Sequence, residues 1–329
     1  MRLTVSRDMD IPADSLELFL SDRSGISLGD AVSVELGDNK QRKRVFTGDV
    51  AEIAVTAQGA RVRALGKMNA LLNLRISNIY EKQAAGDIVR DLVRQAGLSG
   101  GTIDDGPNLP TFVVDQRRSA YEYVRDLAVR LGYELYTDRD GKVMFHALGK
   151  AASLDSAGGG LLGGAVSAVT SVASALLGGG GGSDYKFGKH LVKSSVRRIG
   201  SGPDKVEVGG ESPMSSKGDS TSYWLTTSDG ENHGSSGNGN LLQFQNDPAA
   251  RTQDLANRFA AGHRATRMRA QKNARITILG RSDVELGDSS AVSEIRDKTG
   301  NARGYIRAIR HRYTSDEGYL TDLHFVVEE

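Results

Sequence analysis

The chain has 329 residues, with 42 Lys and Arg against 41 Asp and Glu, a formal net charge of +1 and no Cys. This length is typical of two domains. Without cysteine the chain cannot hold a disulfide framework, a thiolate zinc site or a catalytic thiol. The near-neutral charge argues against a protein that coats nucleic acid non-specifically, unless one face concentrates the basic residues.

The N-terminus and the apolar runs argue against export and membrane insertion. The first ten residues, MRLTVSRDMD, lack the apolar stretch of a signal peptide. No apolar run reaches the ~18 residues of a membrane-spanning helix. We therefore expect no signal peptide and no stable membrane insertion.

Residues 1–75 are predicted to form β structure. Leu16, Leu18 and Leu20 alternate with their neighbours at the period of two that a strand requires. Further alternating runs follow, separated by glycine turns. Four or five antiparallel strands in so short a segment indicate a small barrel or sandwich.

Residues 76–150 change to a helical period. Apolar residues recur at helical spacing through 85–96. A second helix has a capping box at Ser119 and Glu122, and Gly132 ends it. A turn containing Asp-Gly then joins two short strands. This segment is predicted to be a helical α+β insertion with a hairpin.

Residues 185–329 return to β structure with one helix at about 247–272. Asp247 is the expected N-cap of this helix, and Pro248 its first residue. Short alternating strands follow to the end of the chain.

The two β segments resemble each other. In both, a strand, a Leu-Gly-Asp turn, a second strand, a glycine-led strand and a strand that follows a glycine turn come in the same order. This pattern favours two related small antiparallel β-barrels separated by the helical domain. Chance similarity of short strands joined by glycine turns is the alternative. The paired markers are Gly29 and Gly287, Gly48 and Gly304, and Gly59 and Gly318.

Residues 151–184 form a glycine-rich apolar insertion without charge between Asp155 and Asp184. Three interpretations remain open: a flexible linker, a small-residue helix that docks on a partner, or a membrane-active stretch. The candidate docking side chains are Leu161, Leu162, Val166, Val169, Val172, Leu176 and Leu177.

The sequence offers little for catalysis. Ser27 lies in a G-x-S-x-G string, but a strand follows it where a nucleophile elbow needs a helix. The six His residues lack metal-ligand spacing. His311 and His324 lie in facing strands of the last hairpin and could approach each other, although a satisfied pair is favoured over a metal site. We expect a non-enzyme without cofactor or metal.

Basic residues concentrate once, between 251 and 281. A solvated helix face is the simpler interpretation; a surface turned to the lumen of an assembly, to polyanion or to an acidic partner subunit is the functional one. No aromatics are interleaved, which weakens a base-stacking role. The candidate residues are Arg258, Arg264, Arg267, Arg269 and Lys272.

The order of barrel, helical insertion, hairpin and second barrel resembles the baseplate hub proteins of contractile tails. These are the phage late-control D family, with relatives in the tube-initiating hub of myophages and the N-terminal part of type VI secretion spike proteins. The similarity covers most of the chain outside about 150–240. It is carried by the Leu-Gly-Asp turn at 28–30, the A-G-D-I-V run at 85–89, the Q-R-R-S-A-Y run at 116–121, and the closing strands at 304–321.

The resemblance implies a homotrimer whose two barrels per chain give six similar units. Hexameric tail-tube rings would stack on this pseudo-sixfold platform, a trimeric spike would dock on its other side, and DNA or protein cargo would pass through a central channel. The partners implied are tube, spike and other baseplate wedge or adaptor proteins, in a virion or tail-like particle assembled in the bacterial cytoplasm.

Two features depart from the family. The chain ends shortly after the second barrel, so we expect the spike β-helix and any lysozyme-like module to be separate proteins. The glycine-rich insertion is not part of the family pattern.

The alternative function is a carbohydrate-binding or peptidoglycan-degrading tail-associated protein.

Overall fold

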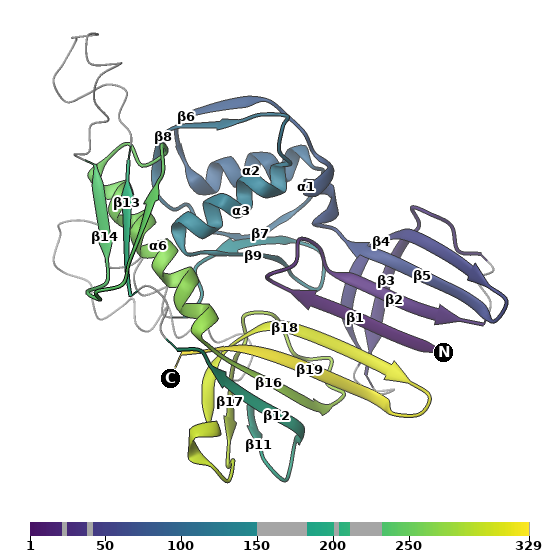
Figure 1. The fold of residues 1–329 in the computed structure, drawn as a ribbon. Helices are drawn as coiled ribbons and strands as arrows, with labels where there is room; N and C mark the ends of the chain where they lie inside the picture. The colour runs from purple at the N-terminus through teal and green to yellow at the C-terminus, as the bar shows by residue number, and fades with distance from the viewer. Residues whose placement is uncertain (22–24, 38–41, 150–182, 201–203, 211–231, 329) are drawn as a thin grey trace, which may run out of the picture.

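The computed structural model describes residues 1–21, 25–37, 42–149, 183–200, 204–210 and 232–328. Its largest element is an 11-stranded sheet, in which two units lie edge to edge (Figure 1). Repeat 1 consists of β1 (Arg2–Asp8), β2 (Ser15–Leu20), β3 (Ala31–Leu36), β4 (Lys43–Thr56) and β5 (Gly59–Gly66). Repeat 2 consists of β12 (Leu191–Arg198), β16 (Lys272–Leu279), β17 (Ser289–Ser293), β18 (Ala302–Thr314) and β19 (Gly318–Val327), and β11 (Ser183–Lys186) pairs with β17.

The two repeats have the same strand order. Repeat 1 runs β1-β2-β5-β4-β3, and repeat 2 runs β12-β16-β19-β18-β17. Even the irregularities correspond, because the β4–β5 ladder shifts register between Val50 and Glu52 and the β18–β19 ladder between Ile306 and Ala308. The internal duplication predicted from the sequence is therefore confirmed as a repeated unit.

The Leu-Gly-Asp turns match at the level of single hydrogen bonds. Each glycine has a positive φ, +84° at Gly29 and +88° at Gly287, which a residue without Cβ adopts freely. Each glycine N–H donates to a carbonyl of the long strand at 2.8 Å. The side chain of Asp30 or Asp288 accepts from the amide three residues earlier, at 2.7 and 2.8 Å respectively. The duplication thus includes the turn chemistry.

The prediction of two small β-barrels is not confirmed, because the described sheet does not close on itself in either repeat. Each repeat curves over an apolar core of its own, centred on Val5 and Phe46 in repeat 1 and on Ile276 and Phe325 in repeat 2. Among the described strands, however, no pairing closes a repeat on itself. One edge of β1 pairs with β2 and the other with β18, so that the edge needed for closure instead joins the two repeats.

The helical insertion forms a separate layer above the sheet (Figure 1). The capping box is confirmed: Ser119 Oγ accepts from the Glu122 N–H, and Glu122 accepts from the Ser119 N–H at 2.7 Å. Gly132 ends that helix in the left-handed region. The insertion contains α1 (Asn69–Asn73), β6 (Asn78–Ala84), α2 (Ala85–Gln95), β7 (Gly100–Ile103), β8 (Asn108–Val114), α3 (Ala120–Leu131), β9 (Glu134–Thr137) and β10 (Val143–His146).

Part of the C-terminal segment belongs to this layer and not to repeat 2. Val206, Val208 and Phe259 share one core with Leu127 of the insertion. The sequence had assigned the whole of 185–329 to the second β domain. The elements concerned are β13 (Lys205–Gly209), β14 (His233–Ser236), β15 (Leu242–Asn246) and α6 (Gln253–Gln271), while a short 3-10 turn (Lys298–Gly300) remains with repeat 2.

Helix α6 begins at Gln253 and not at Asp247. Thr252, whose backbone is extended, caps it by accepting from the Leu255 N–H at 3.2 Å. The Asp247 carboxylate is instead engaged 2.7 Å from the Arg130 guanidinium of α3. Asp247 therefore combines an ion pair to α3 with a local hydrogen bond, since its Oδ1 accepts from the Ala249 N–H at 3.0 Å.

Candidate interaction surfaces

The joined sheet has one apolar and one polar face. On β1, Leu3 and Val5 are buried in the core, so that the alternate residues lie on the opposite face. Strand register continues this polar face across the junction, since Ser6 lies opposite Arg310 and Arg310 opposite Asp322. We call this surface the polar sheet face.

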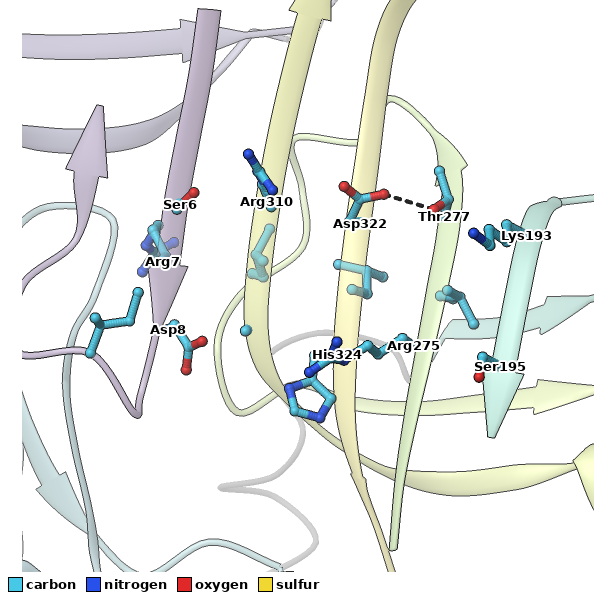
Figure 2. Close-up of a pocket in the computed structure, with 15 residues that line it drawn as sticks. Ser6, Arg7, Asp8, Lys193, Ser195, Arg275, Thr277, Arg310, Asp322 and His324 are labelled. Carbon is cyan, nitrogen blue, oxygen red and sulfur yellow. Dashed lines mark hydrogen bonds between the residues drawn. The ribbon is translucent and has the colours of Figure 1, made fainter. Parts of the chain in front are cut away.

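A depression of about 590 Å³ lies on the polar sheet face where repeat 1 meets repeat 2. Figure 2 shows side chains from β1, β18, β19, β16 and β12 side by side along it. Asp322 accepts from Thr277 at 2.7 Å and from Arg312 Nε at 2.8 Å. These contacts hold charged groups at the surface of a depression that apolar residues such as Ile11 and Ile309 also line.

Basic side chains outnumber acidic ones on the polar sheet face. Strand register places the basic residues Arg2, Arg61, Arg63, Lys193, Arg197, Arg275, Arg310 and Arg312 on it. Strand register also places the acidic residues Asp8, Glu17, Glu35, Asp49, Glu52 and Asp322 on this face. Within the described part of the chain, no three His, Asp or Glu side chains are grouped to hold a metal. The face therefore carries mixed charge with an excess of basic side chains.

A buried ion cluster ties the layers together. Glu134 of β9, with no exposed surface, accepts from Arg307 of β18 and from the Tyr305 hydroxyl, and lies 2.9 Å from Arg269 of α6. Arg307 also donates to Asp10 at 2.7 Å. Burial by itself lowers the pKa of Arg307, but the carboxylates of Asp10 and Glu134 raise it above its ordinary value.

A second cluster lies nearby at the same junction. Arg7 of β1 is 1% exposed, ion-pairs with Glu285 at 3.0 Å and donates to the Thr137 carbonyl at 2.9 Å. Glu285 also pairs with Arg139. Burial raises the pKa of Asp14, beside Arg7, to about 6, although Arg7 opposes the shift. Both clusters join repeat 1, the insertion and repeat 2, which fixes the relative position of the two repeats.

The predicted basic cluster on α6 is divided between the interior and the surface. Arg269 points inward, with its side chain 9% exposed beside Glu134. Arg258 pairs with Asp254 at 3.0 Å, and Arg267 is half-buried. Arg264 and Lys272 line, with Arg269, a pocket of about 280 Å³. A lumen- or partner-facing role for the cluster stays a prediction.

Other candidates from the sequence do not form sites. His311 is buried in the core face of β18, whereas His324 lies on the polar sheet face, so that the two do not approach each other as expected. Ser27 lies in the turn that leads into β3. The proposed docking residues between Leu161 and Leu177 lie outside the described residues.

Sequence reasoning missed both buried ion clusters. Glu134 and Arg307 are far apart in the chain, and each looks like an ordinary strand residue with alternating neighbours. The one available signal was a charged residue inside a short apolar run, as Glu134 is between Tyr133 and Leu135.

Comparison with known structures places this fold. No family model matches the sequence, and no curated protein does. The 43 kDa tail protein of prophage MuSo2 from Shewanella oneidensis aligns over 99% of this chain and 94% of its own length, with a TM-score of 0.66 and 15% identity. The tail protein of Neisseria meningitidis aligns over 99% and 92%, with a TM-score of 0.63 and 14% identity.

A third similar structure belongs to a secretion machine. The E. coli c3393 protein is a component of the type VI secretion system that exhibits structural similarity to the bacteriophage T4 tail proteins gp27 and gp5. It aligns over all of this chain and 73% of its own, with a TM-score of 0.61 and 11% identity. The chain therefore has the fold shared by phage tail proteins and a type VI secretion component. None of its described helices is long and apolar enough to cross a membrane.

Proposed function

We propose that this chain is the structural baseplate hub of a phage tail or other contractile injection machine. Three copies form a ring that joins the hexameric tail tube to the trimeric spike and surrounds a channel for DNA or protein cargo. Within the tail-protein fold, this proposal selects the hub class that the late-control D proteins represent. The protein is then a component of the virion or tail-like particle, with tube, spike and other baseplate proteins as its partners.

The observation that carries this proposal is the duplicated unit. Two copies of one five-stranded repeat, matched in strand order, bulge position and turn hydrogen bonds, lie in a single chain. Three such chains present six similar units, which is the number a hexameric ring needs for equivalent contacts. Neither a saccharide-binding module nor a hydrolase would require this internal repetition.

The polar sheet face supports the channel. It is continuous across both repeats and carries mixed charge with a basic excess. A surface without a large apolar patch does not adhere to what passes over it. We assign this face to the lumen, and we propose a role without catalysis, cofactor or metal.

Co-expression with tail tube and spike proteins from the same genome tests the proposal. We expect the chain to co-purify with both and to have the mass of three copies by light scattering. Negative-stain images should then show a ring between tube and spike. A monomer that binds peptidoglycan or saccharide and neither tail protein would contradict the hub role.

A further inference from the structure

The long strands β4 and β18 are corresponding strands, but their edges are used differently. In β18 the first half pairs with β17 and the second half, from Ala308 to Thr314, pairs with β1 of the other repeat. In β4 the first half pairs with β3 in the same way. Its second half, residues 52–56, pairs with β5 on one side, and no described strand pairs with its other side.

Strand β12 has a matching open edge. It occupies in repeat 2 the place of β1 in repeat 1, since Val5 lies opposite Leu16 of β2 and Val196 opposite Ala274 of β16. One edge of β1 pairs with β2 and the other with β18. One edge of β12 pairs with β16, while its other edge has no partner among the described strands.

Corresponding residues are buried at the β18–β1 junction and exposed or half-buried at the two open edges. His311 on β18, across from Val5 of β1, has no exposed surface, and neither has Val5. The corresponding residue of β4 is Val55, which is 64% exposed. Val196, the counterpart of Val5, is only half-buried. Repeat 2 therefore buries at the β18–β1 junction the surface that repeat 1 leaves uncovered at β4.

We propose that residues 52–56 of β4 in one copy pair antiparallel with β12 of the next copy, in the register of the β18–β1 junction. This inference rests on the proposed trimeric hub and names the strands that join neighbouring copies into a ring. Val55 then lies opposite Val196 of the neighbouring copy, Thr56 opposite Ser195, and Glu52 opposite Ile199. Junctions within and between chains alternate around the ring, and all six have the same geometry.

Edge pairing also accounts for the charges on the open strands. Lys193, Arg197 and Arg198 of β12 make a basic edge that disfavours pairing with itself. In the proposed register Arg197 is the diagonal neighbour of Glu52, within reach of a long side chain. The contact is head-to-tail, and such contacts close into a ring when the rotation between copies permits it.

Engineered disulfides test the register, because the chain has no native Cys. Val55→Cys with Val196→Cys in one chain should give, on mild oxidation, a covalent trimer in non-reducing gels, since directly opposed strand residues have the Cα separation of a disulfide. The matched control is Val55→Cys with Ser195→Cys, whose side chains point to opposite faces and should not cross-link. Val55→Cys and Val196→Cys chains mixed as single variants should give a covalent dimer.

Each outcome bears on a separate claim. Equal cross-linking of both pairs, a trimer by light scattering that cross-links in neither, or a chain that stays monomeric would overturn the edge pairing. A covalent trimer that fails to bind tube and spike proteins would support the edge pairing and overturn only the hub function. Under reducing conditions, thermal unfolding of the single variants should stay close to that of the parent chain, because Val→Cys nearly conserves side-chain volume.

Discussion

At the residue scale, Glu134 determines how firmly the layers are joined. It is fully buried, and two arginines and a tyrosine hydroxyl from other elements surround it. We expect Glu134→Gln to lower the free energy of unfolding by about 3–5 kcal/mol, because buried guanidinium groups lose their counter-charge. Glu294→Gln, which removes one half of an exposed pair with Lys186, should cost about 0–1 kcal/mol. Chemical denaturation measures both; equal effects would contradict the role of the cluster.

His311 makes stability depend on pH. Burial, together with Arg7 and Arg139, lowers the pKa of this imidazole to about 3. The unfolded chain, with a histidine pKa of about 6.5, therefore binds the proton first as the solution becomes acidic. The stability that the neutral ring contributes is present above about pH 6.5 and is lost as pH falls toward 3.

We expect His311→Gln to flatten this dependence. The free energy of unfolding of the variant, measured by urea titration at several pH values, should fall less between about pH 6.5 and pH 4 than that of the parent. An unchanged slope in His311→Gln would assign the acid sensitivity to other groups.

At the scale of elements, two corresponding glycines allow the neighbouring strand to approach closely in each curved ladder. A Cβ on Gly304 would lie 1.7 Å from the Val326 carbonyl oxygen, and one on Gly48 would lie 2.1 Å from that of Leu65. Backbone must move in either case, so Gly304→Ala and Gly48→Ala should each cost about 3 kcal/mol. Gly200→Ala, with no atom within 4 Å, should change stability by less than about 0.5 kcal/mol. Thermal or chemical unfolding measures the three variants, and a tolerated Gly304→Ala would show that the ladder is looser than described.

At the scale of the whole molecule, the proposed trimer would use between chains the same kind of junction that joins the two repeats within one chain. Val5→Asp places a charge in the intrachain junction and should destabilise the chain by on the order of 4 kcal/mol. Val196→Asp, at the corresponding position of the open edge, should leave the single chain folded but shift it from trimer to monomer. Unfolding curves and light scattering separate the two effects. A Val196→Asp chain that remains trimeric would contradict the equivalence of the junctions.

The sequence by itself determined the local features and the duplication. The Leu-Gly-Asp turns, the Ser119 capping box and the helix end at Gly132 depend on residues a few positions apart, and short-range hydrogen bonds and glycine conformations fix them. The repeated order of these turns was enough to predict two related β units.

Only the tertiary structure decided how the units meet. The pairing of β1 with β18 joins residues about 300 positions apart, and it replaced the expected closed barrels with one continuous sheet. Asp247 pairs with Arg130 of α3 outside α6, and Glu134 contacts Arg269 and Arg307 in the interior. Long-range backbone pairing and buried ion pairs depend on where distant segments come together in space, which alternation and spacing along the chain do not record.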